Sequence, residues 1–81
     1  MNTRFCNLVR LEGIHAHETN PPIASLHEGY AILLEELDEL WDEVRKKAEA
    51  RDPKEVLKEL VQIGAMAQRV AEDVLYFLDE E

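Results

Sequence analysis

Apolar residues recur at intervals of three and four along the middle of the chain. The positions are Leu26, Tyr30, Leu33, Leu34, Leu37, Leu40, Trp41 and Val44. At about 100° per residue, their side chains all point within roughly 60° of one direction, which predicts a strongly amphipathic helix. Ser25 and Glu28 form a capping box at its start, so we expect a helix over residues 25–50.

The same spacing returns after a turn at Arg51 and Asp52. The recurring apolar and small residues are Val56, Leu57, Leu60, Ile63, Gly64, Ala67, Ala71, Val74, Leu75 and Leu78. Asp52 is a good N-cap, and Pro53 suits the first helical position. We expect a second long helix over residues 53–80. Because the connection is short, the two helices should form a long antiparallel hairpin.

Residues 1–22 carry a weaker pattern. Phe5, Leu8 and Val9 have helical spacing, but Gly13 and the polar run at 15–20 interrupt it before two prolines. The sequence predicts a short helix followed by a loop for this N-terminal segment.

Two helices alone cannot cover both apolar stripes, whereas two docked hairpins can. Gly64 is expected on the inward face, where it would let a neighbouring helix approach opposite Trp41 or Tyr30. We therefore expect one all-α domain over residues 1–81 that pairs into a four-helix-bundle-type homodimer, or into a tetramer.

Composition and net charge limit the partners and the compartment that we expect for this protein. The chain has 81 residues, of which 46% are hydrophobic, and a formal net charge of −9. That charge argues against nucleic acid and anionic membranes as partners, because both need a basic surface. The lone Cys6 and the lack of a membrane-length apolar run lead us to expect a soluble, cytoplasmic protein.

Acidic residues flank the apolar stripes in matching positions. With Leu37 at zero, Glu36 lies at about −100° and Glu39 at about −160°; with Leu60 at zero, Glu59 and Gln62 take the same two angles. In an antiparallel pair with facing stripes, both flanks emerge on the same side at similar heights. The sequence therefore predicts a groove lined by three carboxylates and one carboxamide.

Carboxylates held together repel one another unless they bind a cation, and Mg²⁺ takes a few carboxylates while keeping water and phosphate ligands. Asp73 lies on the same flank, at about −140°, and could supply a further charge. The alternative is a solvated acidic face with pairs such as Asp42 to Lys46.

These residues resemble a known family. The segments Glu36-Leu-Asp-Glu39-Leu and Glu59-Leu-Val-Gln62 are similar to the E-x-x-E and E-x-x-D motifs of MazG-like nucleoside triphosphate pyrophosphohydrolases, of the all-α NTP pyrophosphatase superfamily. The resemblance covers residues 25–75. It implies Mg²⁺ ligation by Glu36, Glu39, Glu59 and Gln62, although Gln62 stands where the family has Asp.

The resemblance also implies an activity, which is hydrolysis of a nucleoside triphosphate to the monophosphate and pyrophosphate by a dimer or tetramer. Glu36 or Glu39 would then be the catalytic base. The alternative is a catalytically silent MazG-like bundle that serves as an oligomerisation or binding module. Basic residues that could meet phosphate are expected to be solvent-facing charges, namely Lys46, Lys47, Lys54, Lys58 and Arg69.

Overall fold

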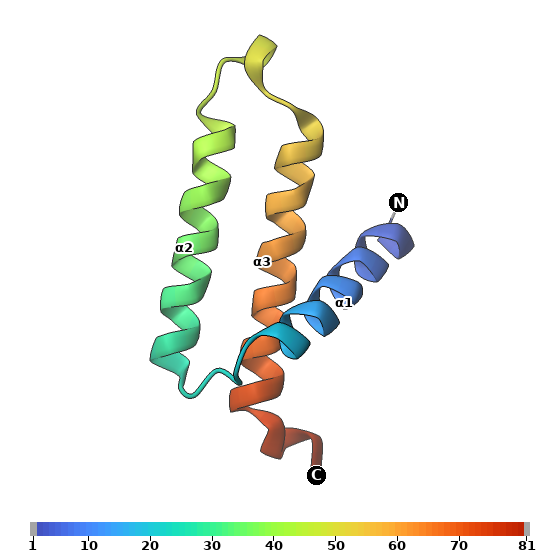
Figure 1. The fold of residues 1–81 in the computed structure, drawn as a ribbon, viewed down its shortest axis with the longest axis vertical. Helices are drawn as coiled ribbons and strands as arrows, with labels where there is room; N and C mark the ends of the chain where they lie inside the picture. Colours follow the sequence, from blue (N-terminus) through green and yellow to red (C-terminus); the bar gives the residue numbers. More distant parts are fainter. Residues whose placement is uncertain (1, 81) are drawn as a thin grey trace.

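The computed structural model describes residues 2–80, and within this range all regular structure is helical (Figure 1). The elements are α1 (Asn2–Thr19), α2 (Leu26–Val44), η1 (Ala48–Ala50), α3 (Pro53–Val74) and η2 (Tyr76–Glu80), where η marks a 3₁₀ helix. The predicted all-α class is confirmed.

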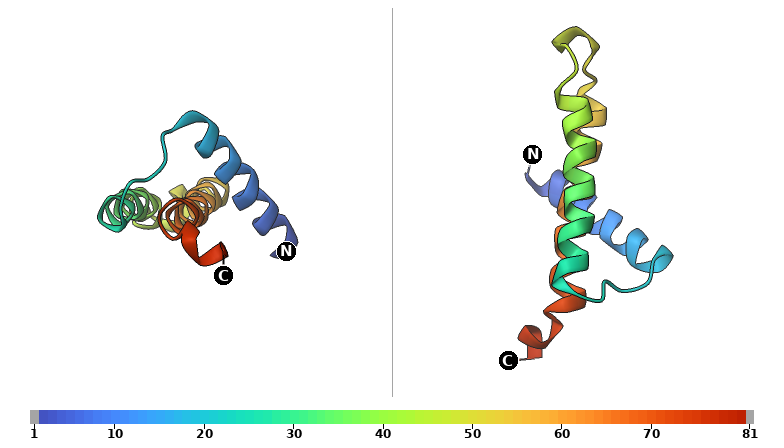
Figure 2. Two further views of the ribbon diagram at one scale, coloured as in Figure 1. Left: turned by 90° about the horizontal axis from the view of Figure 1, so that it is seen from below. Right: turned by 90° about the vertical axis from the view of Figure 1, so that its left-hand side faces the viewer.

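The central element is α3. It lies side by side with α2 and runs in the opposite direction, while α1 crosses its other side obliquely (Figures 1 and 2). Among the described residues, α1 and α2 both pack on α3 and not on one another. The molecule is elongated, with extents of 48 × 28 × 22 Å.

The N-terminal helix is longer than the sequence predicts. A short helix and a loop were expected, but α1 continues through Gly13 to Thr19. Gly13 and Ala16 are buried, and a Cβ built on Gly13 would lie 3.5 Å from Oε1 of Gln68 on α3. Contact with α3 thus offsets the roughly 1 kcal/mol that glycine costs in a helix.

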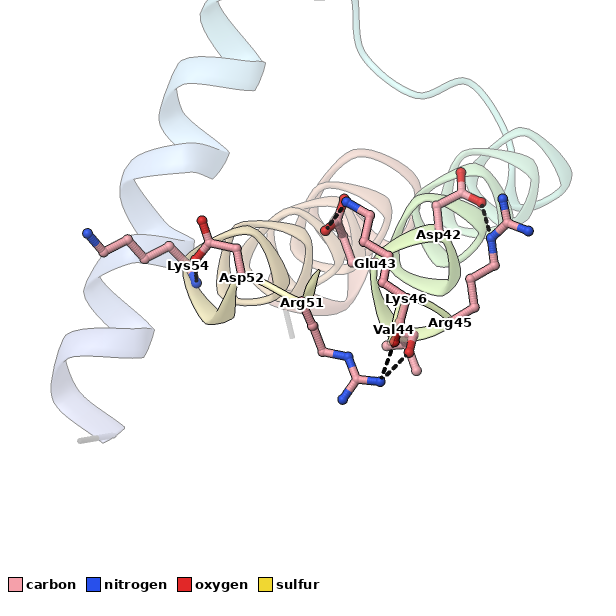
Figure 3. A network of polar contacts seen from close by, with 8 residues as sticks. All are labelled: Asp42, Glu43, Val44, Arg45, Lys46, Arg51, Asp52 and Lys54. Atoms are coloured by element: carbon pink, nitrogen blue, oxygen red, sulfur yellow. Dashed lines mark hydrogen bonds and ion pairs between the residues drawn. The ribbon is translucent and has the colours of Figure 1, made fainter. Parts of the chain in front are cut away.

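The prediction that the middle helix continues to Ala50 is wrong, because α2 ends at Val44. The guanidinium of Arg51 reaches back to this end: Nη2 donates to the carbonyl oxygens of Val44, at 2.6 Å, and Lys46, at 3.0 Å (Figure 3). A helix leaves its last carbonyls without partners, and Arg51 satisfies them here.

Two ion pairs lie near this end of α2. Asp42 pairs with Arg45 at 3.4 Å and Glu43 pairs with Lys46 at 3.0 Å (Figure 3). The alternative of a solvated acidic face suggested a pair of Asp42 with Lys46, which is not found among the described residues; Asp42 and Glu43 each pair with the residue three positions further on.

Both predicted N-caps are confirmed. The hydroxyl of Ser25 accepts a hydrogen bond from the backbone N–H of Glu28 at 3.1 Å, and Oδ1 of Asp52 accepts one from Lys54 at 2.9 Å. The C-terminal end differs from the prediction, because α3 stops at Val74 and the chain tightens into η2. A last turn of this kind is common at helix C-termini.

Small residues bring the helices together. The buried cluster consists of Ala16, Ala65 and Met66, with Ile32 and Leu33 packed against it. A Cβ on Gly29 would lie 2.7 Å from Val70, so α2 approaches α3 more closely than alanine would allow.

Gly64 plays a different part from the one expected. It faces α1 and not α2, since a Cβ built there would lie 2.9 Å from Cγ2 of Val9. Trp41 and Tyr30, the expected partners, are 60% and 69% exposed.

The linker between α1 and α2 is fastened to α3. Ile23 is 3% exposed, and its backbone N–H donates to Oδ2 of Asp73 at 2.9 Å. Nη2 of Arg69 donates to the carbonyl of Pro21 at 3.0 Å. None of the helices described in residues 2–80 is long and apolar enough to cross a bilayer.

Candidate functional site

Three carboxyl groups converge where α2 and α3 lie side by side. Glu36 and Glu39 are one turn apart on α2, and Glu59 lies across from them on α3. One oxygen from each carboxyl group lies within 4.8 Å of the others. The predicted convergence is found, but the apolar stripes do not face one another as expected: Leu37 and Leu60 are 48% and 40% exposed. The acidic flanks of the two helices face one another instead, since Glu36 and Glu59 are partly buried. We call Glu36, Glu39 and Glu59 the carboxylate group.

Burial sets the electrostatics of this group. Oε2 of Glu36 and Oε2 of Glu59 are both buried without a hydrogen-bond partner. Burial, and then the charge of Glu39 nearby, raises the pKa of Glu36 from 4.5 to about 7. The same two causes raise the pKa of Glu59. The negative charges are therefore held together at a cost, which a proton or a cation would relieve.

The donor set fits magnesium. It offers hard carboxylate oxygens, and two of those oxygens lack any partner in the fold. Glu39 is exposed, so the group is open to solvent on one side. Mg²⁺ favours such an arrangement, in which a few carboxylates bind the ion while water and phosphate oxygens complete its octahedron.

Gln62 lies one turn after Glu59 on α3 and is partly buried. It lines a pocket of about 360 Å³ together with Glu36, which is the member of the carboxylate group that this pocket includes. Its oxygen is a neutral acceptor where an aspartate would carry charge.

The structure places Asp73 elsewhere. Its carboxylate accepts the hydrogen bond from Ile23 that holds the linker, and it lines a different pocket together with His17. Among the described residues, the acids that converge within 4.8 Å are Glu36, Glu39 and Glu59, without Asp73. Its position on the same flank of α3 is too far along the axis to join them.

The pocket shared by Glu36 and Gln62 lies between all three helices, and we call it the α1 pocket. Its polar lining consists of Glu12, His15, Thr19, Asn20, Glu36, Gln62 and Arg69. It exists because α1 and α2 both pack on α3 while leaving a space between themselves.

Sequence reasoning missed this pocket, because it predicted a short helix followed by a loop for residues 1–22 and did not place a long helix against α3. It was also wrong about Arg69, which is buried at 6% exposure and is not a solvent-facing charge. The available signal was Val61 and Ala65, two apolar residues four apart on the side of α3 away from its main stripe. Both are buried, and they mark a second packing face.

Comparison of the chain with models of protein families, with curated proteins and with solved structures gave no match.

Proposed function

We propose that this protein is a Mg²⁺-dependent nucleoside triphosphate pyrophosphohydrolase of MazG-like type, acting in the cytoplasm. The observation that carries the proposal is the carboxylate group, in which Glu36, Glu39 and Glu59 converge with two buried oxygens unpartnered. Once these carboxyl groups are ionised, the arrangement costs stability unless a cation binds, and a metal-dependent hydrolase needs a site of this kind.

The proposed reaction cleaves the triphosphate between the α- and β-phosphorus atoms. A water oxygen forms a bond to the α-phosphorus, the bond to the bridging oxygen breaks with its electron pair going to pyrophosphate, and a carboxylate takes the proton from water. Bound Mg²⁺ would neutralise phosphate oxygens and orient the attacking water.

We assign these roles to individual residues according to the exposure of their side chains. Glu36 and Glu59 hold the cation through their inner oxygens, which no other group satisfies. Glu39 is exposed and reaches the open side, so it is the better placed of the two candidate bases, Glu36 and Glu39. A carboxylate within reach of the water is sufficient for general base catalysis, which contributes about 10²- to 10⁴-fold.

Gln62 supports a second candidate, a silent MazG-like module that binds without catalysis. A carboxamide weakens Mg²⁺ binding relative to a carboxylate, so the site could have lost turnover while keeping its scaffold. Pyrophosphate release from a panel of ribo- and deoxynucleoside triphosphates separates the two candidates when Gln62→Asp is measured alongside. Release by the native chain supports the enzyme. Release by Gln62→Asp alone supports the silent module with an intact scaffold, and release by neither contradicts the enzyme and favours a module that binds without catalysis.

We also propose that the chain works as a homodimer in a four-helix arrangement. The exposed large apolar side chains of α2 are Leu26, Tyr30, Leu34, Leu37, Trp41 and Val44. They fall within about 80° of arc, so they form one stripe on the side of α2 away from the core. Leu57 and Leu60 of α3 are also exposed, at 37% and 40%.

The exposed area is of the size that a dimer requires. The accessible surface is 6162 Å², whereas a compact monomer of 9.4 kDa has roughly 5,000 Å². The excess of about 1,100 Å² is comparable to the roughly 800 Å² that each partner buries in a standard interface.

Sedimentation equilibrium tests the dimer. We expect the native chain to sediment at twice its mass and Trp41→Glu to sediment as a monomer. Leu11→Glu introduces the same charge at an exposed apolar residue of α1, outside the stripe, and should remain dimeric. A monomeric native chain would contradict the proposal.

A further inference from the structure

Arg69 is a buried cation without a carboxylate partner. Its side chain is 6% exposed. Nη2 donates to the Pro21 carbonyl at 3.0 Å, Nη1 lies 3.6 Å from Sδ of Met66, and Nε has no partner. Among residues 4–78, no carboxylate forms an ion pair with this guanidinium. A buried charge whose hydrogen-bond partners are all neutral is costly, and an anion brought beside it would be held strongly.

The position of Arg69 says where such an anion would lie. Arg69 and Gln62 line the same pocket and are seven residues apart on α3, which is about 10 Å along the helix axis. Gln62 marks the end of the pocket near Glu59, and Glu36 of the carboxylate group lines the pocket as well. The α1 pocket therefore extends from Glu36, one member of the carboxylate group, to a buried guanidinium.

Other polar groups in the pocket lining limit the chemical class of ligand that the pocket can bind. His15 lines the pocket from α1, and its imidazole can donate a hydrogen bond to a phosphate oxygen. Glu12 and Glu36 also line it, so a polyanion without a cation would be repelled. The lining suits a polyphosphate complexed with a divalent cation, with the cation at the carboxylate group and the far phosphates towards Arg69.

We propose that the α1 pocket binds the polyphosphate chain of the nucleotide, and that Arg69 binds the terminal phosphoryl groups that leave as pyrophosphate. The choice of ligand rests on the proposed function. The proposal adds an anion-binding residue on α3 and gives α1 the role of a pocket wall.

Titration calorimetry with Mg²⁺ and an α,β-methylene nucleoside triphosphate, which resists cleavage at the relevant bond, tests the proposal. We expect Arg69→Gln to weaken binding by at least about tenfold, as for loss of a charge-assisted hydrogen bond. Arg69→Lys keeps the charge and should lose less. Arg45→Gln removes an exposed arginine that pairs only with Asp42, and should bind as the native chain does.

A second pair of variants covers the case in which Arg69→Gln fails to fold through loss of its bond to Pro21. His15→Glu places a negative charge in the pocket wall, and Asn7→Glu places the same charge on an exposed residue of α1 outside the pocket. We expect His15→Glu to weaken binding by roughly tenfold and Asn7→Glu by less than about twofold. Equal affinity in His15→Glu and Asn7→Glu would overturn the proposal, as would a native chain that does not bind the analogue.

Affinity and pyrophosphate release, measured on the same variants, distinguish a failure of the pocket proposal from a failure of the proposed function. Pyrophosphate release with unchanged affinity in the Arg69 and His15 variants would reject the pocket and leave the hydrolase. Affinity that depends on both residues, without release of pyrophosphate, would reject the hydrolase and support the pocket as a polyphosphate site.

Discussion

Asp73, near the end of α3, accepts through Oδ2 a hydrogen bond from the backbone N–H of Ile23 at 2.9 Å. The two residues are 50 positions apart, and the bond fastens the linker between α1 and α2 to α3. Because Ile23 is almost fully buried, water cannot easily replace Asp73 as the acceptor for its backbone N–H. The position of α1, and with it one wall of the α1 pocket, depends on this attachment.

Removal of this acceptor should destabilise the fold. We expect Asp73→Ala to lower the free energy of unfolding by about 1–3 kcal/mol, because it leaves a buried N–H without a partner. Asp73→Asn keeps an acceptor oxygen and should cost less. Urea unfolding measures both variants. A stability equal to the native value in Asp73→Ala, with Mg²⁺ binding lost, would instead assign Asp73 to the metal site.

Gly29 and Gly13 should respond in opposite ways to alanine. A Cβ on Gly29 would lie 2.7 Å from Val70, so Gly29→Ala should force α2 away from α3 and cost about 1–3 kcal/mol. A Cβ on Gly13 would meet Gln68 at an ordinary 3.5 Å, so Gly13→Ala should gain up to about 1 kcal/mol of helix propensity.

Thermal unfolding of the two variants, together with the double variant Gly29→Ala/Val70→Ala, tests this contact. The smaller side chain at position 70 should restore part of the stability lost at position 29. Equal losses of stability in Gly29→Ala and Gly13→Ala would show that Gly29 is not required for the close approach of α2 to α3.

Stability should fall as the pH rises towards neutrality. The pKa of Glu36 is raised from 4.5 to about 7 by burial and by Glu39, so the folded chain binds more protons than the unfolded chain in this range. Stability from this group is present below pH 4.5 and is lost as the pH rises through about 7. The raised pKa of Glu59 acts in the same direction.

Urea unfolding at several pH values between 4.5 and 8 measures the slope of the free energy of unfolding against pH. Glu36→Gln should flatten it and should be the more stable protein at pH 8, because a neutral carboxamide removes the repulsion. Asp38→Asn changes an exposed residue of the same helix whose charge does not contribute to the raised pKa of Glu36 or Glu59, and it should keep the native slope. A slope in Glu36→Gln as steep as in the native chain would count against this assignment.

Magnesium should reverse the loss of stability at higher pH. Because the cation binds the ionised carboxylates, it should raise the melting temperature at pH 8 and have little effect at pH 5. Glu59→Gln should abolish the increase, whereas Asp38→Asn, on an exposed part of α2, should retain it. The same increase in Glu59→Gln as in the native chain would place magnesium somewhere else.

Local signals predicted part of this fold well. Ser25 and Asp52 cap their helices as expected, because an N-cap depends on residues only two or three positions away. Helical angles and the antiparallel arrangement of α2 and α3 predicted the convergence of Glu36, Glu39 and Glu59, although the premise that the apolar stripes face one another was wrong.

The features that sequence reasoning missed depend on contacts between distant segments. Gly13 and the polar run after it suggest a helix break until α3 is placed beside them. Arg69 has the sequence context of a surface charge, and only the packing of α1 and the linker buries it. The end of α2 at Val44 depends on Arg51, seven residues further on, binding back to its carbonyl.

The most direct test of the central claim is magnesium-dependent release of pyrophosphate by the native chain, by Glu39→Gln and by Asp38→Asn. Glu39 belongs to the carboxylate group and is exposed, so its replacement should relieve repulsion and leave the fold intact, while Asp38 beside it lies outside the group. We predict that the native chain and Asp38→Asn release pyrophosphate and that Glu39→Gln is slower by about 10²-fold or more. Equal rates in Glu39→Gln and Asp38→Asn, or no release by the native chain, would contradict the claim that the carboxylate group is a catalytic magnesium site.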